Sequence, residues 1–95
     1  MRIQTDEEKM PTNDKPKIVM YTTKWCPNCW MAKRVMASMG VAYDEINISH
    51  DPDAAAIVER INRGYRSVPT LVFPDGSTLT EPRPAELSAK LSLML

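Results

Sequence analysis

The chain has 95 residues, the size of one domain, and its 12 basic and 12 acidic residues leave no net charge. This balance gives no global field for nucleic acid or for a charged membrane surface, and no apolar run reaches the ~20 residues that span a bilayer. Two cysteines and a single histidine cannot supply the four ligands of a zinc site within one chain.

The first 16 residues are polar and show no sustained hydrophobic period. We therefore expect a flexible tail over 1–16, followed by a single domain over 17–95. The charged N-terminus lacks the apolar segment of a signal peptide, which predicts a cytoplasmic protein. Structural disulfides are rare in that reducing compartment, so a cysteine pair there is expected to react or to bind a metal.

A strand, a helix and a second strand are predicted directly after the tail. Residues 18–22 form a short apolar run typical of a buried strand. Apolar residues then recur at helical spacing from Ala32 to Met39, and Gly40 ends the helix. Residues 41–48 supply the second strand, and elements of these lengths predict a right-handed unit with parallel strands.

The next predicted element is a helix with clear start and stop signals. Asp51 is the expected N-cap, Pro52 suits the first helical position, and Gly64 is a natural stop. The predicted buried stripe of this helix consists of Ile57, Val58 and Ile61.

A hairpin and a final helix complete the chain. Strands over 70–73 and 77–80 flank an Asp-Gly turn, and prolines after the second strand bar its continuation. The core face of the last helix is marked by Leu87, Leu91 and Met94. The predicted fold class is therefore α/β, with a four-stranded mixed sheet and helices on both faces.

The motif Trp25-Cys26-Pro27-Asn28-Cys29 holds both cysteines at the start of the first predicted helix. Two thiols at C-x-x-C spacing can close into a small disulfide ring and reopen, as in thiol–disulfide oxidoreductases. Unpaired N–H groups and the helix dipole favour a thiolate at Cys26, and Lys24 adds a positive charge, so Cys26 is the expected nucleophile. Cys29 lies one turn later on the core side and is the expected resolving thiol.

Other interpretations of the cysteine pair stay open. The two cysteines could be buried and inert, or Cys26 could form half of an intersubunit iron–sulfur or metal site that a small thiol completes. An oxidoreductase of the arsenate-reductase type would need an arginine cluster beside Cys26, for which the sequence offers only Arg66 and Arg83.

A second motif, Val68-Pro69-Thr70, precedes the third predicted strand. A cis bond at Pro69 would turn the chain sharply and leave the backbone of Val68 free to pair with an extended substrate. Base rates favour an ordinary trans proline. The cysteine pair upstream favours the cis form, and we adopt it.

Several residues near these motifs have both a functional and a structural interpretation. Trp25 either forms an exposed apolar rim beside Cys26 or packs against the loop from the last strand. Trp30 is expected to be half exposed. Tyr65 and Arg66 either touch a bound thiol or lie in a solvated loop, and His50 is expected at the surface without a role as a base.

These features together resemble the glutaredoxin family of the thioredoxin fold over residues 17–93, and within it the actinobacterial mycoredoxins. The resemblance rests on the motifs over 21–29, 67–70 and 73–77. It implies that Cys26 is the nucleophile, that Cys29 is the second cysteine and that Pro69 is the cis-proline. The candidate substrate-binding residues are Lys24, Trp25, Pro27, Val68, Pro69 and Thr70.

Departures from the family pattern bear on the small thiol that the protein uses. Glutathione-using glutaredoxins usually carry a lysine where this chain has Thr23, an aromatic residue where it has Asn28, and Gly-Gly-x-Asp where it reads Thr80-Glu81-Pro82-Arg83. Without that segment nothing receives the charged end of glutathione, which favours mycothiol, a sugar-based thiol, as co-substrate.

The resemblance also implies partners. We expect a monomeric dithiol oxidoreductase that reduces disulfide-containing or S-thiolated proteins and draws electrons from a flavoprotein thiol reductase. No tightly bound cofactor, metal, nucleic acid or membrane is expected. One alternative is an NrdH-type redoxin that thioredoxin reductase reduces. The other is a glutaredoxin without catalytic activity that binds an iron–sulfur cluster or a metal.

Overall fold

A computed structural model describes residues 17–94, so the predicted tail lies outside the described residues. The elements are β1 (Ile18–Thr22), α1 (Pro27–Ser38), β2 (Tyr43–Asn47), the short 3-10 helix η1 (Ile48–His50), α2 (Pro52–Ile61), β3 (Thr70–Val72), β4 (Thr78–Thr80) and α3 (Pro84–Ser92). This order confirms the predicted succession of strands and helices. No helix in the described part of the chain is long and apolar enough to cross a membrane.

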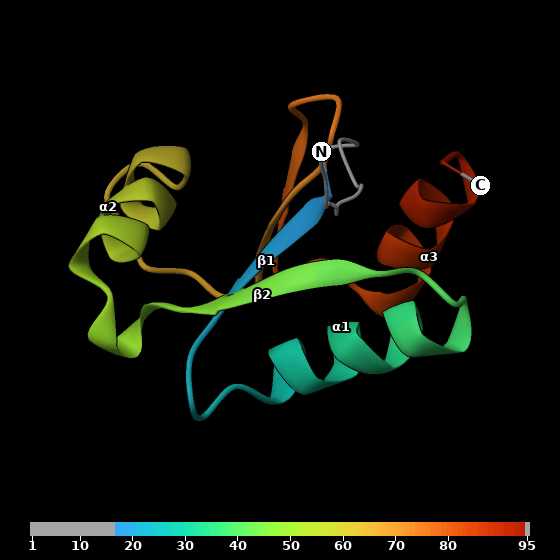
Figure 1. Ribbon diagram of the computed structural model, residues 1–95, viewed down its shortest axis with the longest axis horizontal. Coiled ribbons are helices and arrows are strands. Elements are labelled where there is room, and N and C mark those ends of the chain that lie inside the picture. The colour runs from blue at the N-terminus through green and yellow to red at the C-terminus, as the bar shows by residue number, and fades with distance from the viewer. Residues whose placement is uncertain (1–16, 95) are drawn as a thin grey trace, which may run out of the picture.

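The four strands form one mixed sheet in the order β2-β1-β3-β4. β1 and β2 run parallel, with Thr22 opposite Asn47, while β3 runs antiparallel to both β1 and β4. Figure 1 shows the sheet in the middle, with α2 apart from α1 and α3. The predicted parallel unit and hairpin are confirmed, and the sheet joins them by placing β3 beside β1.

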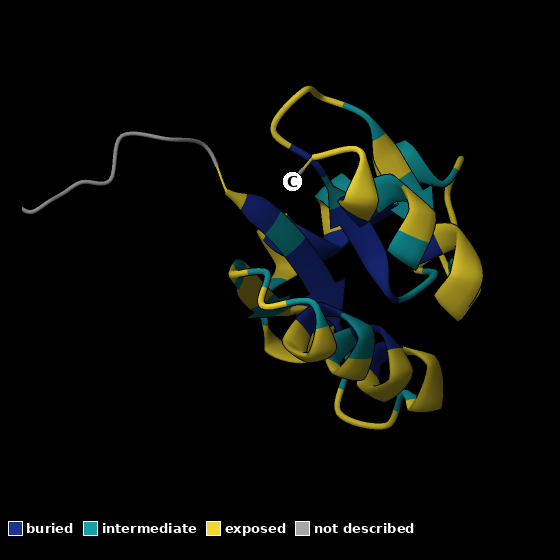
Figure 2. Cartoon of the chain, turned by 90° about the vertical axis from the view of Figure 1, so that its right-hand side faces the viewer, coloured by how far each residue is buried: buried dark blue, intermediate teal, exposed yellow. Residues whose placement is uncertain are grey.

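Two hydrophobic cores cover the two faces of the sheet. Successive residues of a strand point to opposite faces, so β1 sends Met20 towards α1 and α3 and Tyr21 towards α2. The core beneath α1 and α3 is made by Ile18, Met20, Ala32, Met36, Leu71, Phe73, Leu87 and Leu91. The core beneath α2 is made by Tyr21, Ile48, Ala54, Ala55 and Val58. Figure 2 shows the buried strands enclosed by helices whose outer faces are exposed.

The helix boundaries follow local chemistry. The Asp51 side chain accepts a hydrogen bond from Ala54 N at 3.0 Å, as predicted for the N-cap of α2. The α2 helix already ends at Ile61, because Asn62 caps it before Gly64 is reached. Gly64 still satisfies the helix end, since its N–H donates to the Glu59 carbonyl at 2.6 Å.

Several details of the prediction were wrong. The buried face of α2 consists of Ala54, Ala55 and Val58, whereas Ile57 and Ile61 are only half-buried. β2 spans Tyr43–Asn47 instead of 41–48. It stops before Ile48 because the Asn47 side chain accepts a hydrogen bond from Ser49 N at 2.8 Å and starts the 3-10 turn. β3 and β4 are each one residue shorter than predicted. Met94 lies beyond the end of α3 and is 41% exposed, so it does not belong to the core face.

Candidate active site

Cys26 is the N-cap of α1 and stands where the chain leaves the sheet. Its backbone is extended, and its Sγ accepts a hydrogen bond from the backbone N–H of Cys29 at 3.0 Å. Pro27 occupies the first helical position, where a missing N–H leaves no hydrogen bond unmade. The sulfur therefore lies on the positive end of the helix, where backbone N–H groups favour an anion.

Cys26 and Cys29 form a disulfide with their Cα atoms 5.1 Å apart. Cys29 is only 2% exposed, whereas Cys26 is half-buried. The predicted difference in exposure is therefore present. A reagent from solvent reaches Cys26 first, while Cys29 faces the core beneath α1.

The cis-proline loop lies next to this site. The Val68–Pro69 peptide bond is cis, as predicted. Because Tyr21 pairs with Thr70 in the antiparallel register of β1 and β3, Pro69 falls beside the end of β1 that leads to Cys26. Within residues 17–94, no hydrogen bond is made to the backbone N–H or C=O of Val68.

Thr70 was predicted to touch the substrate, but the structure buries it completely. Its hydroxyl donates to the Ser67 carbonyl at 2.7 Å and accepts from Asn62 Nδ2 at 3.0 Å. Asn62 also accepts from the Thr80 hydroxyl at 2.6 Å. The Thr70 side chain therefore shapes the loop from within. The sequence did not predict this role of Asn62. The one sign of it there is an amide side chain close to the predicted end of a helix.

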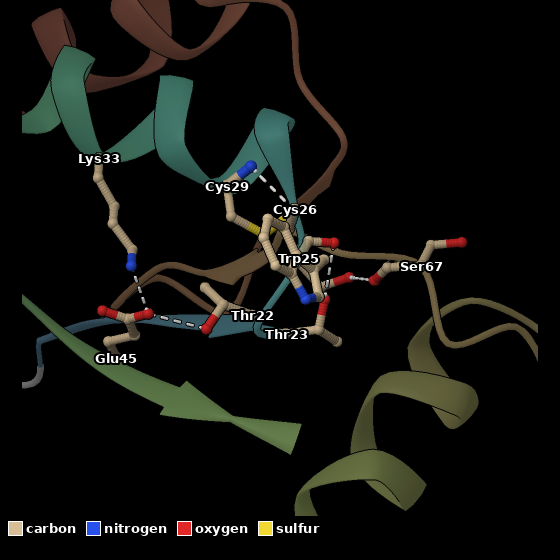
Figure 3. The surroundings of a disulfide bond; sticks show 9 residues. Thr22, Thr23, Trp25, Cys26, Cys29, Lys33, Glu45 and Ser67 are labelled. Carbon is tan, nitrogen blue, oxygen red and sulfur yellow. Dashed lines mark hydrogen bonds and ion pairs between the residues drawn. A yellow bond between two sulfur atoms is a disulfide. The ribbon is translucent and has the colours of Figure 1, made fainter. Parts of the chain in front are cut away.

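A second group that the sequence did not reveal lies under the first turns of α1. Glu45 Oε2 accepts a hydrogen bond from the Thr22 hydroxyl at 2.8 Å and lies 2.6 Å from Lys33 Nζ. Figure 3 shows Thr22 between Glu45 and the disulfide. Partial burial raises the pKa of Glu45, but the hydrogen bonds from Lys33 and Thr22 and the charge of Lys33 outweigh it, so the pKa lies below its usual value.

The chain matches the glutaredoxin family over residues 18–77. The chain belongs to the glutaredoxin family. Among its relatives is a protein of Mycobacterium tuberculosis whose name places it with the glutaredoxins, 46% identical over 78% of this chain and 88% of that protein. Mycoredoxin 1 of Corynebacterium glutamicum is 35% identical over 81% of this chain and 95% of its own length.

Solved structures show the same thioredoxin-like fold. The glutaredoxin-like NrdH-redoxin of Escherichia coli superimposes with a TM-score of 0.65 at 27% identity, over 78% of this chain and 93% of that one. The thioredoxin-like protein BC3987 has a TM-score of 0.64 at 30% identity, over 83% of this chain and 100% of the other. With its Cys26–Cys29 pair, this glutaredoxin is a thiol–disulfide oxidoreductase.

Three large aromatic side chains near the two motifs in sequence are exposed at the surface of this glutaredoxin. Trp25 is 87% exposed, so it does not pack against the loop from the last strand. Trp30 is 57% exposed, and the guanidinium of Arg34 lies 4.9 Å from its ring centre. Tyr65, just before the cis-proline loop, is 72% exposed. Lys24 and Pro27, on either side of the Trp25-Cys26 pair in sequence, are exposed as well.

Arg66 and His50 lie beside α2. Arg66 Nε is 2.6 Å from Glu59 Oε2, so its charge is engaged by α2. Both residues line a hollow of about 260 Å³ with Asp51 and the η1 segment. His50 is exposed, as predicted. The described residues contain no group of three or more histidine, cysteine, aspartate or glutamate side chains placed to hold a metal.

Proposed function

We propose that this glutaredoxin reduces protein disulfides and mixed disulfides between proteins and a small thiol by a dithiol route. The observation that carries the proposal is the unequal placement of the two sulfurs. Cys26 Sγ accepts an N–H at the start of α1 and is reachable, whereas Cys29 lies 2% exposed behind it. A stabilised thiolate and a protected second thiol are what sequential disulfide exchange needs.

The proposed reaction has two exchange steps. The Cys26 thiolate attacks one sulfur of the substrate disulfide, and the other substrate sulfur leaves as a thiolate and takes up a proton. The Cys29 thiol then loses its proton and attacks Cys26 Sγ, which releases the second substrate thiol. The substrate gains two electrons, and the protein ends as the Cys26–Cys29 disulfide seen in the structure.

The segment before Pro69 suits an extended substrate chain. The free N–H and C=O of Val68 can pair with the backbone beside the reacting sulfur, as when a peptide adds to a sheet edge. Trp25, next to Cys26 in sequence, and Tyr65, three residues before Val68, both expose apolar surface. We assign substrate contact to Lys24, Trp25, Pro27 and the backbone around Val68 and Pro69.

Charge near the cis-proline loop supports mycothiol as the small thiol. The backbone N–H of Glu81 donates to the Pro69 carbonyl at 2.8 Å, which brings this acidic residue next to the loop. Glu81 has a φ of 49°, in the left-handed region that favours glycine. An exposed carboxylate there repels the carboxylates of glutathione but not an uncharged sugar-based thiol.

The decisive experiment compares reduction of one test peptide carrying either mycothiol or glutathione, each with its own recycling thiol and reductase. We expect faster reduction of the mycothiolated peptide. The variant Glu81→Gly should narrow the preference by speeding up the glutathione reaction, while Glu86→Gln, an exposed carboxylate on α3, serves as control. Equal rates for both peptides in the wild type would contradict the assignment of mycothiol.

The variant Cys29→Ser separates a dithiol from a monothiol route. We expect it to lose reduction of intramolecular protein disulfides and to keep part of its activity on mixed disulfides, because a second small thiol can release those. Complete loss of the latter activity would exclude the monothiol route. Unchanged reduction of intramolecular disulfides would contradict the role of Cys29.

An NrdH-type function is the second candidate, favoured by the structural likeness to the NrdH-redoxin of Escherichia coli. In that case thioredoxin reductase would reduce the Cys26–Cys29 disulfide directly, and neither thiolated peptide would be a good substrate. In both cases we propose a cytoplasmic monomer that receives electrons from a flavoprotein reductase and acts on disulfide-containing or S-thiolated proteins.

A further inference from the structure

The ion pair of Lys33 and Glu45 stands on the side of the sheet that α1 covers, which is also the side of the resolving thiol. Cys29 and Lys33 are four residues apart on α1, so their side chains share one face of the helix. Lys33 Nζ is 2.6 Å from Glu45 Oε2, and Thr22 donates to that oxygen at 2.8 Å. Thr22 is completely buried, whereas the side chains of Lys33 and Glu45 keep 38% and 36% exposure.

The strand pattern places Thr22 and Glu45 on the same side of the sheet as Cys29. Met20 and Tyr43 belong to the core beneath α1 and α3. Thr22 follows Met20 by two residues on β1, and Glu45 follows Tyr43 by two on β2, so both point towards α1. Figure 3 shows both side chains, with Lys33 above Glu45, in the surroundings of the disulfide.

The other ionisable groups on neighbouring elements are placed differently. Asp44 alternates to the opposite face of β2 and lies 3.9 Å from Lys17. Tyr21 belongs to the core beneath α2, and Tyr43 pairs with Ile18 at the far end of β1. On α3, Lys90 lies 3.3 Å from Asp75. The exposed charged groups of the surrounding loops and helices are Lys24, Arg34, Glu81, Arg83 and Glu86.

We propose that Lys33 and Glu45 control how readily the Cys29 thiol ionises. They thereby decide whether Cys29 or a second small thiol resolves the mixed disulfide on Cys26. The inference rests on the proposed dithiol route. While both charges are present, their fields at Cys29 oppose each other, and burial disfavours the charged form of its thiol. If one charge is removed, the other acts on the sulfur without compensation.

The lowered pKa of Glu45 supports this arrangement, because the carboxylate stays charged over the range in which the enzyme works. The affected step is the attack of Cys29 on Cys26 Sγ. Cys29 gives up its proton, the bond from Cys26 to the substrate sulfur breaks, and the leaving thiolate takes up a proton. A charge beside Cys29 changes the first of these events.

The direct test measures ionisation of Cys29 in the variant Cys26→Ser, by the ultraviolet absorbance of the thiolate as a function of pH at low salt. Adding Glu45→Gln leaves the Lys33 cation unpaired and should move half-ionisation of Cys29 to lower pH. Adding Lys33→Met should move it to higher pH. With both substitutions combined, half-ionisation of Cys29 should return towards its pH in the Cys26→Ser protein.

Asp44→Asn is the matched control, since it removes the same charge from the neighbouring residue of β2 on the opposite face of the sheet. It should leave the titration of Cys29 unchanged. The inference would be overturned if Glu45→Gln and Lys33→Met moved the half-ionisation pH of Cys29 in the same direction. It would also be overturned if their shifts were no larger than that of Asp44→Asn. A purely structural tie between α1 and β2 would lower stability in both variants without opposite shifts.

The functional consequence is tested in the protein with both cysteines. Release of a mixed disulfide by Cys29 should become about threefold or more faster in Glu45→Gln and correspondingly slower in Lys33→Met. The two proposals can fail separately. If the Cys29 thiolate shifts as expected but the Cys29→Ser variant still reduces intramolecular disulfides, the electrostatic assignment stands and the dithiol route is rejected. If the dithiol activity is normal but the thiolate of Cys29 does not shift, the dithiol route stands and the electrostatic assignment is rejected.

Discussion

Asp75 shows how one side chain joins two elements. Its carboxylate accepts hydrogen bonds from the Ser77 backbone at 2.9 Å and from the Ser77 hydroxyl at 2.6 Å, and Lys90 on α3 lies 3.3 Å away. Lys90 also lies 5.0 Å from the ring centre of Phe73. The turn between β3 and β4 is thus fixed internally and tied to the last helix.

These contacts predict an acid-sensitive contribution from Asp75. Hydrogen bonds from Ser77, followed by Lys90, lower the pKa of Asp75 from 3.8 to about 2. A lowered pKa in the folded state stabilises the protein above the unfolded value, and this contribution is lost as the pH falls through about 2. The carboxyl carbon of Asp75 should therefore titrate near pH 2 by NMR.

The variant Ser77→Ala provides the control, because it removes the hydroxyl donor and keeps the backbone donor. It should move the titration of Asp75 to higher pH. A wild-type midpoint near the ordinary value of an aspartate, or no change in Ser77→Ala, would contradict the assigned contacts.

At the scale of elements, α2 is the helix that covers its face of the sheet, and its first turn depends on Asp51. Replacing Asp51 by Ala removes the acceptor for Ala54 N and should lower the free energy of unfolding by about 1 kcal/mol. Urea unfolding should show a lower midpoint with an unchanged slope. Asp53→Asn, in the exposed first turn, should have a smaller effect, and equal effects of both variants would contradict capping by Asp51.

The elements were predictable to the extent that their signals are local. The helices follow from the hydrophobic period and from capping signals such as Asp51 followed by Pro52, and the hairpin follows from the Asp-Gly turn. Each of these signals involves residues that are close together in the sequence. The interactions that span the sheet were not predictable in the same way. Thr22 and Glu45 are 23 residues apart, and only the parallel register of β1 and β2 brings them together. Asn62 likewise contacts Thr70 and Thr80 only after the sheet has formed.

At the scale of the whole molecule, stability depends on the two cores. Leu91 is completely buried beneath α3, while Leu93, two residues further, is 84% exposed. Leu91→Ala should lower the free energy of unfolding by about 2–5 kcal/mol, a large part of the total for a domain of this size. Leu93→Ala is the matched control and should change it by less than about 0.5 kcal/mol. Similar losses in both variants would contradict the placement of α3.

The site could be predicted where motif and helix start coincide, and less well where it is assembled from distant segments. Cys26 at a helix N-cap followed from its spacing and from Pro27. The unequal burial of the cysteines followed from helical geometry. The burial of Thr70 and the location of Glu81 beside Pro69 did not follow, because both depend on how the loops after α2 and β4 meet.

The position of Trp25 has a practical consequence. The chain contains two tryptophans, and Trp25, adjacent to Cys26 in sequence, lies beside the disulfide in Figure 3. A disulfide quenches the emission of a nearby indole, so reduction of the pair should brighten the intrinsic fluorescence. Trp30→Phe would isolate this signal. The protein therefore carries its own optical probe, with which each turnover can be followed in a stopped-flow instrument without a coupled enzyme or an added dye.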